Sequence, residues 1–411
     1  MADTTVVKTR FSIFRLPRNV WAVSLTSFLM DISSEMVINI LPLYLANVLG
    51  VRTNIIGLIE GVAESTASLL KLFSGWFSDK IGARKWLAVL GYGMSAAAKP
   101  FFYIANTWGV VAGVRWADRI GKGIRTAPRD ALVADSVTKE MRGAAFGFHR
   151  AADTAGAMLG LLIALGVVWA AQSNGLTLGA PTFRTVVLIS LVPAVLAVLA
   201  LALVAKDVPV RERRPLPRFA LGQLGRPFLV FLVITAIFDL GNSSDAFLVL
   251  RAQERGLSVI GILGMLATFN LVYSLISLPA GALSDRIGRR ALIISGWLVY
   301  ALIYFGFAAV QTGWQVWALY VVYGLYYGMA YGTSRALITD LVPDALRGTA
   351  FGTYNAVLGL LDLPASVIAG VLWQGAFGWQ GFGAHAPFLF GGGMALIAAL
   401  LMAVWNPKIS Q

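Results

Sequence analysis

Long apolar runs recur along the whole chain, and they limit its fold more than any other feature of the sequence. A bilayer core of about 30 Å takes roughly 20 helical residues to cross. Hydrophobic residues form 58% of the chain and charged residues 13%, whereas a soluble domain has about 45–50% and about 25%. We therefore predict an all-α integral membrane protein with twelve transmembrane helices. The runs lie near 20–46, 55–78, 86–105, 109–134, 146–170, 184–205, 227–250, 258–283, 290–310, 314–340, 349–374 and 386–406.

Lysine and arginine residues are concentrated in alternate gaps between these runs. If the amino terminus lies inside, the inner segments hold 20 of them, and the outer loops hold only Arg52, Arg184 and Arg255. Basic residues near span ends stay on the cytoplasmic side of a membrane. We therefore expect a multi-pass protein of the cytoplasmic membrane with both termini in the cytoplasm. This topology accounts for the net charge of +13 without nucleic-acid binding.

The second half of the chain repeats the first half in the same direction. Residues 75–84 return 206 positions later as residues 281–290, and the stretch that starts at Arg142 returns at Arg347. Parallel six-helix halves are typical of carriers whose substrate site lies near the midplane between the halves. The predicted segments are a cytoplasmic tail (1–19), a first six-helix bundle (20–205), a basic cytoplasmic linker (206–226), a second six-helix bundle (227–406) and a cytoplasmic tail (407–411).

Both copies of the repeated loop resemble the signature Gly-x-x-x-Asp-Arg-x-Gly-Arg-Arg of the major facilitator superfamily, with Lys80 and Ala83 as departures in the first copy. The resemblance covers nearly the whole chain and implies alternating access between two halves. It also implies that the loop residues help to close the cytoplasmic side, with a plain topology anchor as the alternative. The residues assigned to this gate and to its neighbouring basic positions are Gly75, Asp79, Arg84, Arg125, Arg129, Arg142, Gly281, Asp285, Arg290 and Arg347.

Two further signatures of this family are matched in part. Arg115 stands 19 residues before Ala134, close to the spacing in the family's fourth helix. Gly147, Gly156 and Gly160 keep part of the glycine spacing that exporters of the family have in their fifth helix, but the expected proline is replaced by leucine. This resemblance favours antiport weakly, and close helix packing requires glycines at similar spacing.

Basic residues form a stripe along the run 109–134. Their offsets of 4, 7, 10 and 14 from the first member keep them on one face of a helix. A charge inside the membrane faces the bundle interior or a water-filled cavity. The stripe is therefore a candidate wall for an anionic group of a substrate, and pairing with acids of the first half is the alternative. Its members are Arg115, Arg119, Lys122, Arg125 and Arg129, and the residues assigned to the substrate site are Arg115, Asp118, Arg119 and Lys122.

Several acids inside the spans of the first half are candidates for carrying a coupling proton. A carboxylate can bind a proton when its basic partner moves away and can release the proton when the partner returns. Asp31 and Glu35 are the leading candidates, because the first helix lines the cavity in the family that the chain resembles. Glu64 and Asp153 are the further candidates. A fixed ion pair with the basic stripe is the alternative for these acids.

In the second half, aromatic residues occupy the positions that correspond to the basic stripe. On the run 314–340, four tyrosines occupy the positions 205 residues beyond Arg115, Asp118, Lys122 and Thr126. Tyrosine offers a ring for stacking and a hydroxyl for hydrogen bonds. We assign these tyrosines and one acid to the substrate site, with packing or an interfacial belt as the alternative. The assigned residues are Asp239, Tyr320, Tyr323, Tyr327 and Tyr331.

The sequence therefore predicts a secondary active transporter that moves a small polar or anionic organic solute by alternating access, coupled to protons. A chain with no cysteine and two histidines has no disulfide and no multi-histidine metal site. We expect no enzymatic activity and no cofactor; the expected partners of this monomer are the small-molecule substrate, protons and the lipid bilayer. A proton-driven exporter of drugs or lipophilic cations is the competing function, and a non-transporting membrane sensor is a remote alternative.

Overall fold

Every regular element is a helix in the part of the chain that the computed structural model describes, residues 16–82, 84–138, 141–172, 175–208, 221–343 and 346–405. The first half (16–208) contains α1 (Arg18–Ile38), α2 (Leu41–Asn47), α3 (Thr53–Ile81), α4 (Arg84–Ala98), α5 (Phe101–Ile104), α6 (Trp108–Asp135), α7 (Arg142–Gln172) and α8 (Ala180–Val204). The second half (221–405) contains the 3-10 helix η3 (Leu221–Gln223), α9 (Gly225–Leu240), α10 (Ala246–Glu254), α11 (Val259–Ile287), α12 (Arg289–Ala309), α13 (Gly313–Leu341), α14 (Arg347–Gln374) and α15 (Ala386–Val404).

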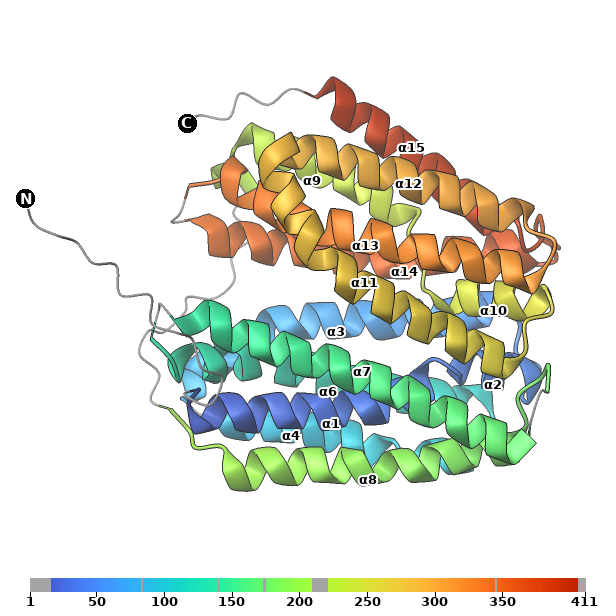
Figure 1. Ribbon diagram of the computed structural model, residues 1–411, viewed down its shortest axis with the longest axis horizontal. Coiled ribbons are helices and arrows are strands. Elements are labelled where there is room, and N and C mark those ends of the chain that lie inside the picture. The colour runs from blue at the N-terminus through green and yellow to red at the C-terminus, as the bar shows by residue number, and fades with distance from the viewer. Residues whose placement is uncertain are drawn as a thin grey trace, which may run out of the picture.

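The two halves form two layers of helices that run roughly along one direction (Figure 1). In the first layer α1 packs against α7 and α8, and α6 packs against α3 and α4. In the second layer α12 packs against α13 and α15, and α11 packs against α13. The start of α1 and the end of α15 lie at the same end of the molecule (Figure 1), which we call the terminal end. The opposite end is called the loop end.

Each predicted apolar run corresponds to one helix or to a pair of helices with a break between them. The breaks fall after α1, α4 and α9, so the pairs are α1 with α2, α4 with α5, and α9 with α10. Among the described residues, seven stretches are long and apolar enough to cross a membrane by length and composition. The prediction of an all-α membrane protein is confirmed, and the count of twelve crossings is consistent with this arrangement. Most of the predicted tails and linker lie outside the described residues.

The outer surface of the helices carries large apolar side chains. Leu203 at the end of α8 is 74% exposed, and Leu302 on α12 is 71% exposed. In water such surface is unfavourable by about 25 cal/mol per Å², whereas lipid tails accept it. A helix surface of this kind fits a bilayer.

Glycine residues let helices approach closely at several contacts, two of which bear on the predicted site. A methyl group at Gly156 or Gly160 of α7 would collide with carbonyl oxygens of α1. A methyl group at Gly61 of α3 would lie 3.0 Å from the Cα atom of Leu363 on α14. Gly156 and Gly160, two of the three exporter-like glycines, therefore pack against α1, and α3 and α14 form a tight seam between the halves. The other seam joins α7 and α11.

Hydrogen bonds hold the two halves together at the loop end. Arg52 donates from Nη2 to the carbonyl oxygen of Gln374 over 2.8 Å, and the main-chain N–H of Thr53 donates to Gln374 Oε1 over 2.5 Å. Gln253 of α10 donates to the carbonyl oxygen of Leu176 over 2.9 Å. The two halves are thus bridged by hydrogen bonds at the loop end on both sides of the molecule.

Candidate functional site

An ion-pair network joins α6 to α3 in the core of the first half. Arg115 donates from Nε to Glu60 Oε1 over 3.2 Å and from Nη2 to Glu60 Oε2 over 2.6 Å. The same Nη2 atom donates to Glu64 Oε1 over 3.1 Å. Arg115 is 2% exposed and Glu60 is 4% exposed. Buried charges require partners, so this two-point contact stabilises the packing of α3 against α6.

Arg119 and Asp118 extend the network. Arg119 Nε lies 3.3 Å from Glu64 Oε1 and 3.9 Å from Asp118 Oδ2. The same Asp118 oxygen lies 3.8 Å from Arg115 Nη1. Three of the four α6 residues that the sequence assigned to the substrate site are therefore engaged with acids of α3 and with one another. Solvent reaches the network at Glu64, whose side chain is 38% exposed.

The part of the basic stripe nearer the terminal end contacts α4, α1 and its own helix. Arg125 donates from Nη1 to Ser95 Oγ over 2.5 Å, and its guanidinium lies 4.5 Å from the centre of the Tyr92 ring. Arg129 Nη2 lies 2.8 Å from Asp130 Oδ1. These contacts of the two predicted gate cations lie within the first half.

The acids predicted to carry protons have different surroundings. Glu64 belongs to the network with Arg115. Glu35 accepts a hydrogen bond from Asn39 Nδ2 over 2.7 Å. Asp153 Oδ2 lies 3.6 Å from His149 Nε2. Each of these three carboxylates therefore has a neighbour that can donate to it.

Asp31 of α1 and Lys122 of α6 are opposite charges inside the first half that solvent reaches. Lys122 is exposed and Asp31 is partly exposed, and within the described residues neither side chain makes a hydrogen bond or an ion pair. Each lies within electrostatic range of the other. Because these two side chains are close but not in contact, either one can bind a proton or a ligand without first breaking an ion pair.

Matching ion pairs lie at the terminal end of each half. Arg84 at the start of α4 pairs with Asp135 at the end of α6, and it also donates to a carbonyl oxygen one turn earlier on α6. Arg289 at the start of α12 pairs with Asp340 on α13 over 2.5 Å, and it donates to the equivalent carbonyl oxygen. Each second-half residue stands 205 positions after its counterpart. The two halves thus share the same ion pair and the same hydrogen bond to a main-chain oxygen.

Arg290, which the glycine-aligned repeat matches to Arg84, occupies a different position. It donates to two main-chain oxygens at the end of α15, over 2.9 Å and 2.5 Å. The second copy is one residue shorter after its glycine, so α12 begins at Arg289. Arg289 is therefore the structural counterpart of Arg84.

The other residues of the predicted gate are spread along the terminal end. Gly75 is buried on α3, and Arg142 is exposed at the start of α7. Arg347 donates from Nη2 to the carbonyl oxygen of Thr339 over 3.3 Å. The surroundings of four predicted site residues lie outside the part of the chain whose side chains are described: Asp79, Gly281, Asp285 and Tyr331.

The predicted aromatic face of α13 is divided between a packed core and a pocket. Tyr320 and Tyr323 are 1% and 0% exposed. Their ring centres lie 5.1 and 5.6 Å from that of Phe269 on α11, which is a packing distance for aromatic rings. Tyr327 is less buried and lines a pocket that faces α3.

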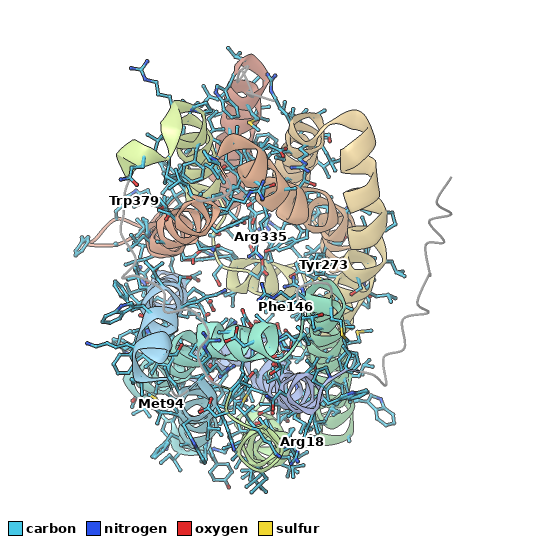
Figure 2. The ribbon with its side chains drawn as sticks, turned by 90° about the vertical axis from the view of Figure 1, so that its left-hand side faces the viewer. Arg18, Met94, Phe146, Tyr273, Arg335 and Trp379 are labelled. Atoms are coloured by element: carbon cyan, nitrogen blue, oxygen red, sulfur yellow. The ribbon has the colours of Figure 1, made fainter. Side chains whose placement is uncertain are left out.

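This pocket, of about 300 Å³, lies where α3 of the first half meets α9, α12, α13 and α14 of the second half. Ser68 and Lys71 of α3 form part of its wall, and Asp239 of α9 and Asp362 of α14 contribute carboxylates. Arg335 of α13 lines it as well, and Figure 2 shows Arg335 close to the boundary between the halves. Both halves therefore touch one space that contains charges of both signs.

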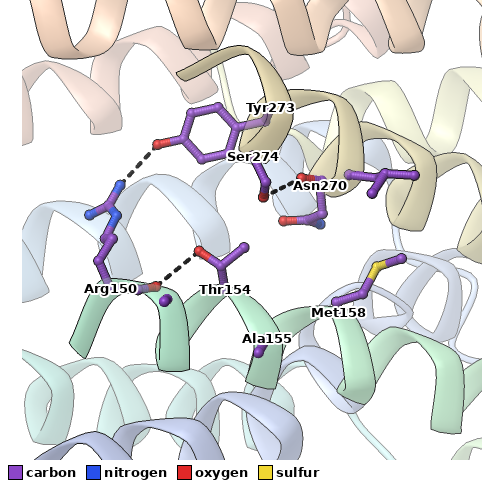
Figure 3. A pocket seen from close by; sticks show the side chains of 9 residues that line it. Arg150, Thr154, Ala155, Met158, Asn270, Tyr273 and Ser274 are labelled. Carbon is purple, nitrogen blue, oxygen red and sulfur yellow. Dashed lines mark hydrogen bonds between the residues drawn. The ribbon is translucent and has the colours of Figure 1, made fainter. Parts of the chain in front are cut away.

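A second pocket, of about 470 Å³, lies at the seam between α7 and α11 (Figure 3). Arg150 of α7 donates from Nη2 to the hydroxyl of Tyr273 on α11 over 2.9 Å. Figure 3 shows this bond at one end of the pocket and Met158 at the other. The bond links the two halves beside a hollow part of the seam.

Sequence reasoning missed several residues of the pocket at α3. Lys71, Arg335 and Asp362 carry a visible signal, because charges inside apolar runs mark functional positions. Trp297 and Tyr326 also line the pocket. They carry no such signal, because aromatic residues are common in apolar helices.

Comparison with known sequences shows one family across the chain. The sequence profile of the Major Facilitator Superfamily matches residues 23–361 and 229–410. An uncharacterized MFS-type transporter of Methanocaldococcus jannaschii is 34% identical over 408 residues, which cover 98% of each chain. The multidrug resistance protein MdtG of Citrobacter koseri is 26% identical over 402 residues, which cover 95% of this chain and 94% of the relative.

Solved structures share the fold. A D-xylose–proton symporter superposes with a TM-score of 0.75 at 17% sequence identity, over 95% of this chain and 98% of the symporter. At this identity the likeness concerns the arrangement of the helices alone.

Proposed function

The chain belongs to the major facilitator superfamily and is a membrane-spanning transporter, and from this premise we propose that it moves a small polar organic solute with an anionic group by alternating access coupled to protons. Alternating access and proton coupling are typical of this family, and the D-xylose–proton symporter has the same fold.

One observation supports the location of the solute site: the pocket of about 300 Å³ has walls from both halves. Ser68 and Lys71 belong to α3, whereas the other walls are helices of the second half. A site between two halves opens to one side of the membrane at a time when the halves rock against each other. The volume lies at the lower end of the roughly 300–1,000 Å³ of ligand pockets, which suits a small solute.

Three cations support the choice of an anionic group. Lys71 and Arg335 line the pocket, and Lys122 is the exposed cation of the α6 stripe. A charge-assisted hydrogen bond contributes about 1.5–3 kcal/mol, so one such contact suffices to orient a small solute.

Coupling to protons is assigned to Asp31, with Glu35 beside it on α1. Asp31 is the candidate without a hydrogen bond or ion pair among the described residues. Its protonation would change the local charge next to Lys122. A change of charge inside the first half is a means of biasing a two-state equilibrium.

The terminal end is proposed to face the cytoplasm. The distribution of basic residues supports this orientation. In that orientation the hydrogen bonds of Gln374 and Gln253 at the loop end close the outer side of the transporter.

Reconstituted vesicles test this proposal with two labelled probes, 3-phenylpropionate and tetraphenylphosphonium. We expect a pH gradient to drive net movement of 3-phenylpropionate in vesicles that contain the protein. Protein-free vesicles are the control, because the protonated acid crosses bilayers unaided. Binding of 3-phenylpropionate without transport would favour a sensor, and failure to bind or to move it would contradict the proposal.

A proton-driven exporter of lipophilic cations is the second candidate. The similarity to the multidrug resistance protein MdtG supports it, and so do the carboxylates of Asp239 and Asp362 in the pocket. In the same vesicles this candidate predicts that a pH gradient moves tetraphenylphosphonium and not 3-phenylpropionate. The two probes therefore separate the two functions.

A further inference from the structure

Asp239 is a buried acid with an unsatisfied oxygen that lines the pocket at α3. It is 8% exposed, and within the described residues no donor lies on its Oδ2 atom. A buried carboxylate without a full set of partners is unfavourable, because the lost hydration is not replaced. The Oδ2 atom of Asp239 therefore lacks a cation or a hydrogen-bond donor, which a ligand in the pocket can supply.

The backbone around Asp239 adds to the attraction for a cation. The helix breaks at this point: α9 ends at Leu240, and α10 begins at Ala246. The carboxyl end of a helix carries a partial negative charge, and broken transmembrane helices use such ends at the substrate and ion sites of transporters. The carboxylate of Asp239 and the carboxyl end of α9 therefore both attract a cation.

Aromatic rings stand next to this carboxylate. The rings of Phe238 and Trp297 are stacked with their centres 5.1 Å apart, and the ring of Tyr326 lies 5.8 Å from that of Phe238. All three residues line the pocket. Aromatic faces attract cations and accept flat apolar groups.

The charges of the pocket are separated along its length. Asp239 and Asp362 lie near the middle of the bundle, at the break after α9 and midway along α14. Lys71 and Arg335 lie nearer the terminal end, on the later turns of α3 and α13. The acidic part and the basic part of the pocket thus lie at different depths.

We propose that Asp239, at the break between α9 and α10, binds the ammonium group of a zwitterionic solute whose carboxylate faces Lys71 and Arg335 and whose apolar portion packs against the rings of Phe238 and Trp297. This inference rests on the proposed function, because it names the solute class of the same site. It assigns to Asp239 the selection of zwitterions over simple organic anions.

Calorimetric titration of the purified full-length protein tests the inference with a matched pair of probes. Phenylalanine and 3-phenylpropionate differ by one ammonium group. We expect the wild-type protein to bind phenylalanine at least about tenfold more tightly, since a charge-assisted hydrogen bond to a partly desolvated carboxylate has this size. Asp239→Asn should remove the preference and leave the affinity for 3-phenylpropionate within about threefold. Asp245→Asn, an acid of the same half outside the pocket wall, should keep the preference.

Three results overturn the inference: a wild-type protein that binds both probes equally, one that binds neither probe, or a preference that survives in Asp239→Asn. If that variant does not fold, the wild-type comparison decides alone. Equal binding of the two probes leaves the proposed function intact, because 3-phenylpropionate is then still a ligand. Binding of neither probe removes the proposed function and this inference together.

Discussion

Arg289 pairs with Asp340 over 2.5 Å, and the pair reproduces in the second half the contact that Arg84 makes with Asp135 in the first. Both pairs join the start of one helix to the end of its neighbour at the terminal end. The two pairs differ in exposure. The side chains are 4% and 13% exposed in the first pair, and 28% and 35% exposed in the second pair.

This difference predicts unequal effects on stability. Asp135→Asn should lower the free energy of unfolding by roughly 3 kcal/mol, because it leaves the buried Arg84 charge without its carboxylate. Asp340→Asn should lower it by only about 0.5–1 kcal/mol, because solvent screens the more exposed pair. Thermal unfolding of the two variants in the same detergent checks the order, and a larger loss for Asp340→Asn would contradict it.

The network between α3 and α6 predicts that its two acids have separable roles. Glu60→Gln should destabilise the protein by about 3–5 kcal/mol, because Arg115 loses its two-point partner in the core. Glu64→Gln should cost much less, since the side chain of Glu64 is 38% exposed. Urea unfolding measures both variants. Glu254→Gln, which removes an exposed partner of Arg251, is the matched control.

The accessible acid on α1 predicts a specific loss of coupling. Asp31→Asn should abolish accumulation driven by a pH gradient and leave exchange of labelled solute across the membrane within about threefold of the wild type, because the amide cannot carry a proton. Accumulation and exchange are measured on the same vesicles. Loss of both activities would assign Asp31 a structural role instead.

The hydrogen bonds of Gln374 predict how the loop end opens. Gln374→Ala removes the side-chain bond to Thr53, which contributes about 1 kcal/mol, so the population open at the loop end should rise about fivefold. Spin labels at Thr177 and Gln311, which are exposed at the loop end on opposite halves, should show longer distances by double electron–electron resonance. An unchanged distance distribution would mean that other contacts close this end.

The sequence predicts the helices better than their breaks. Apolar runs locate the helical segments because a bilayer sets both their length and their composition. The break at Gly241 between α9 and α10 is hidden, because hydropathy averaged over a run does not respond to a local change of backbone direction. That break places Asp239 in the pocket, so the sequence marks Asp239 as a charge in a span without indicating its setting.

The sequence also does not predict which charged residues form ion pairs with each other. The periodicity of α6 predicts that its cations share a face, but several acids of similar depth compete for them. The structure pairs Arg115 with Glu60 and leaves Asp31 accessible. The alignment by glycines gives Arg290 as the counterpart of Arg84, since a one-residue difference in the loop changes which arginine begins the helix.

The most direct test of the central claim is the accessibility of the pocket from the two sides of the membrane. The chain has no cysteine, so Asn355→Cys introduces a single thiol at an exposed position of the pocket wall. A membrane-impermeant maleimide should modify this thiol from the cytoplasmic side and from the outer side in separate experiments, and Gln374→Ala should raise the outer rate. Modification from one side alone under all pH gradients would contradict alternating access at this pocket.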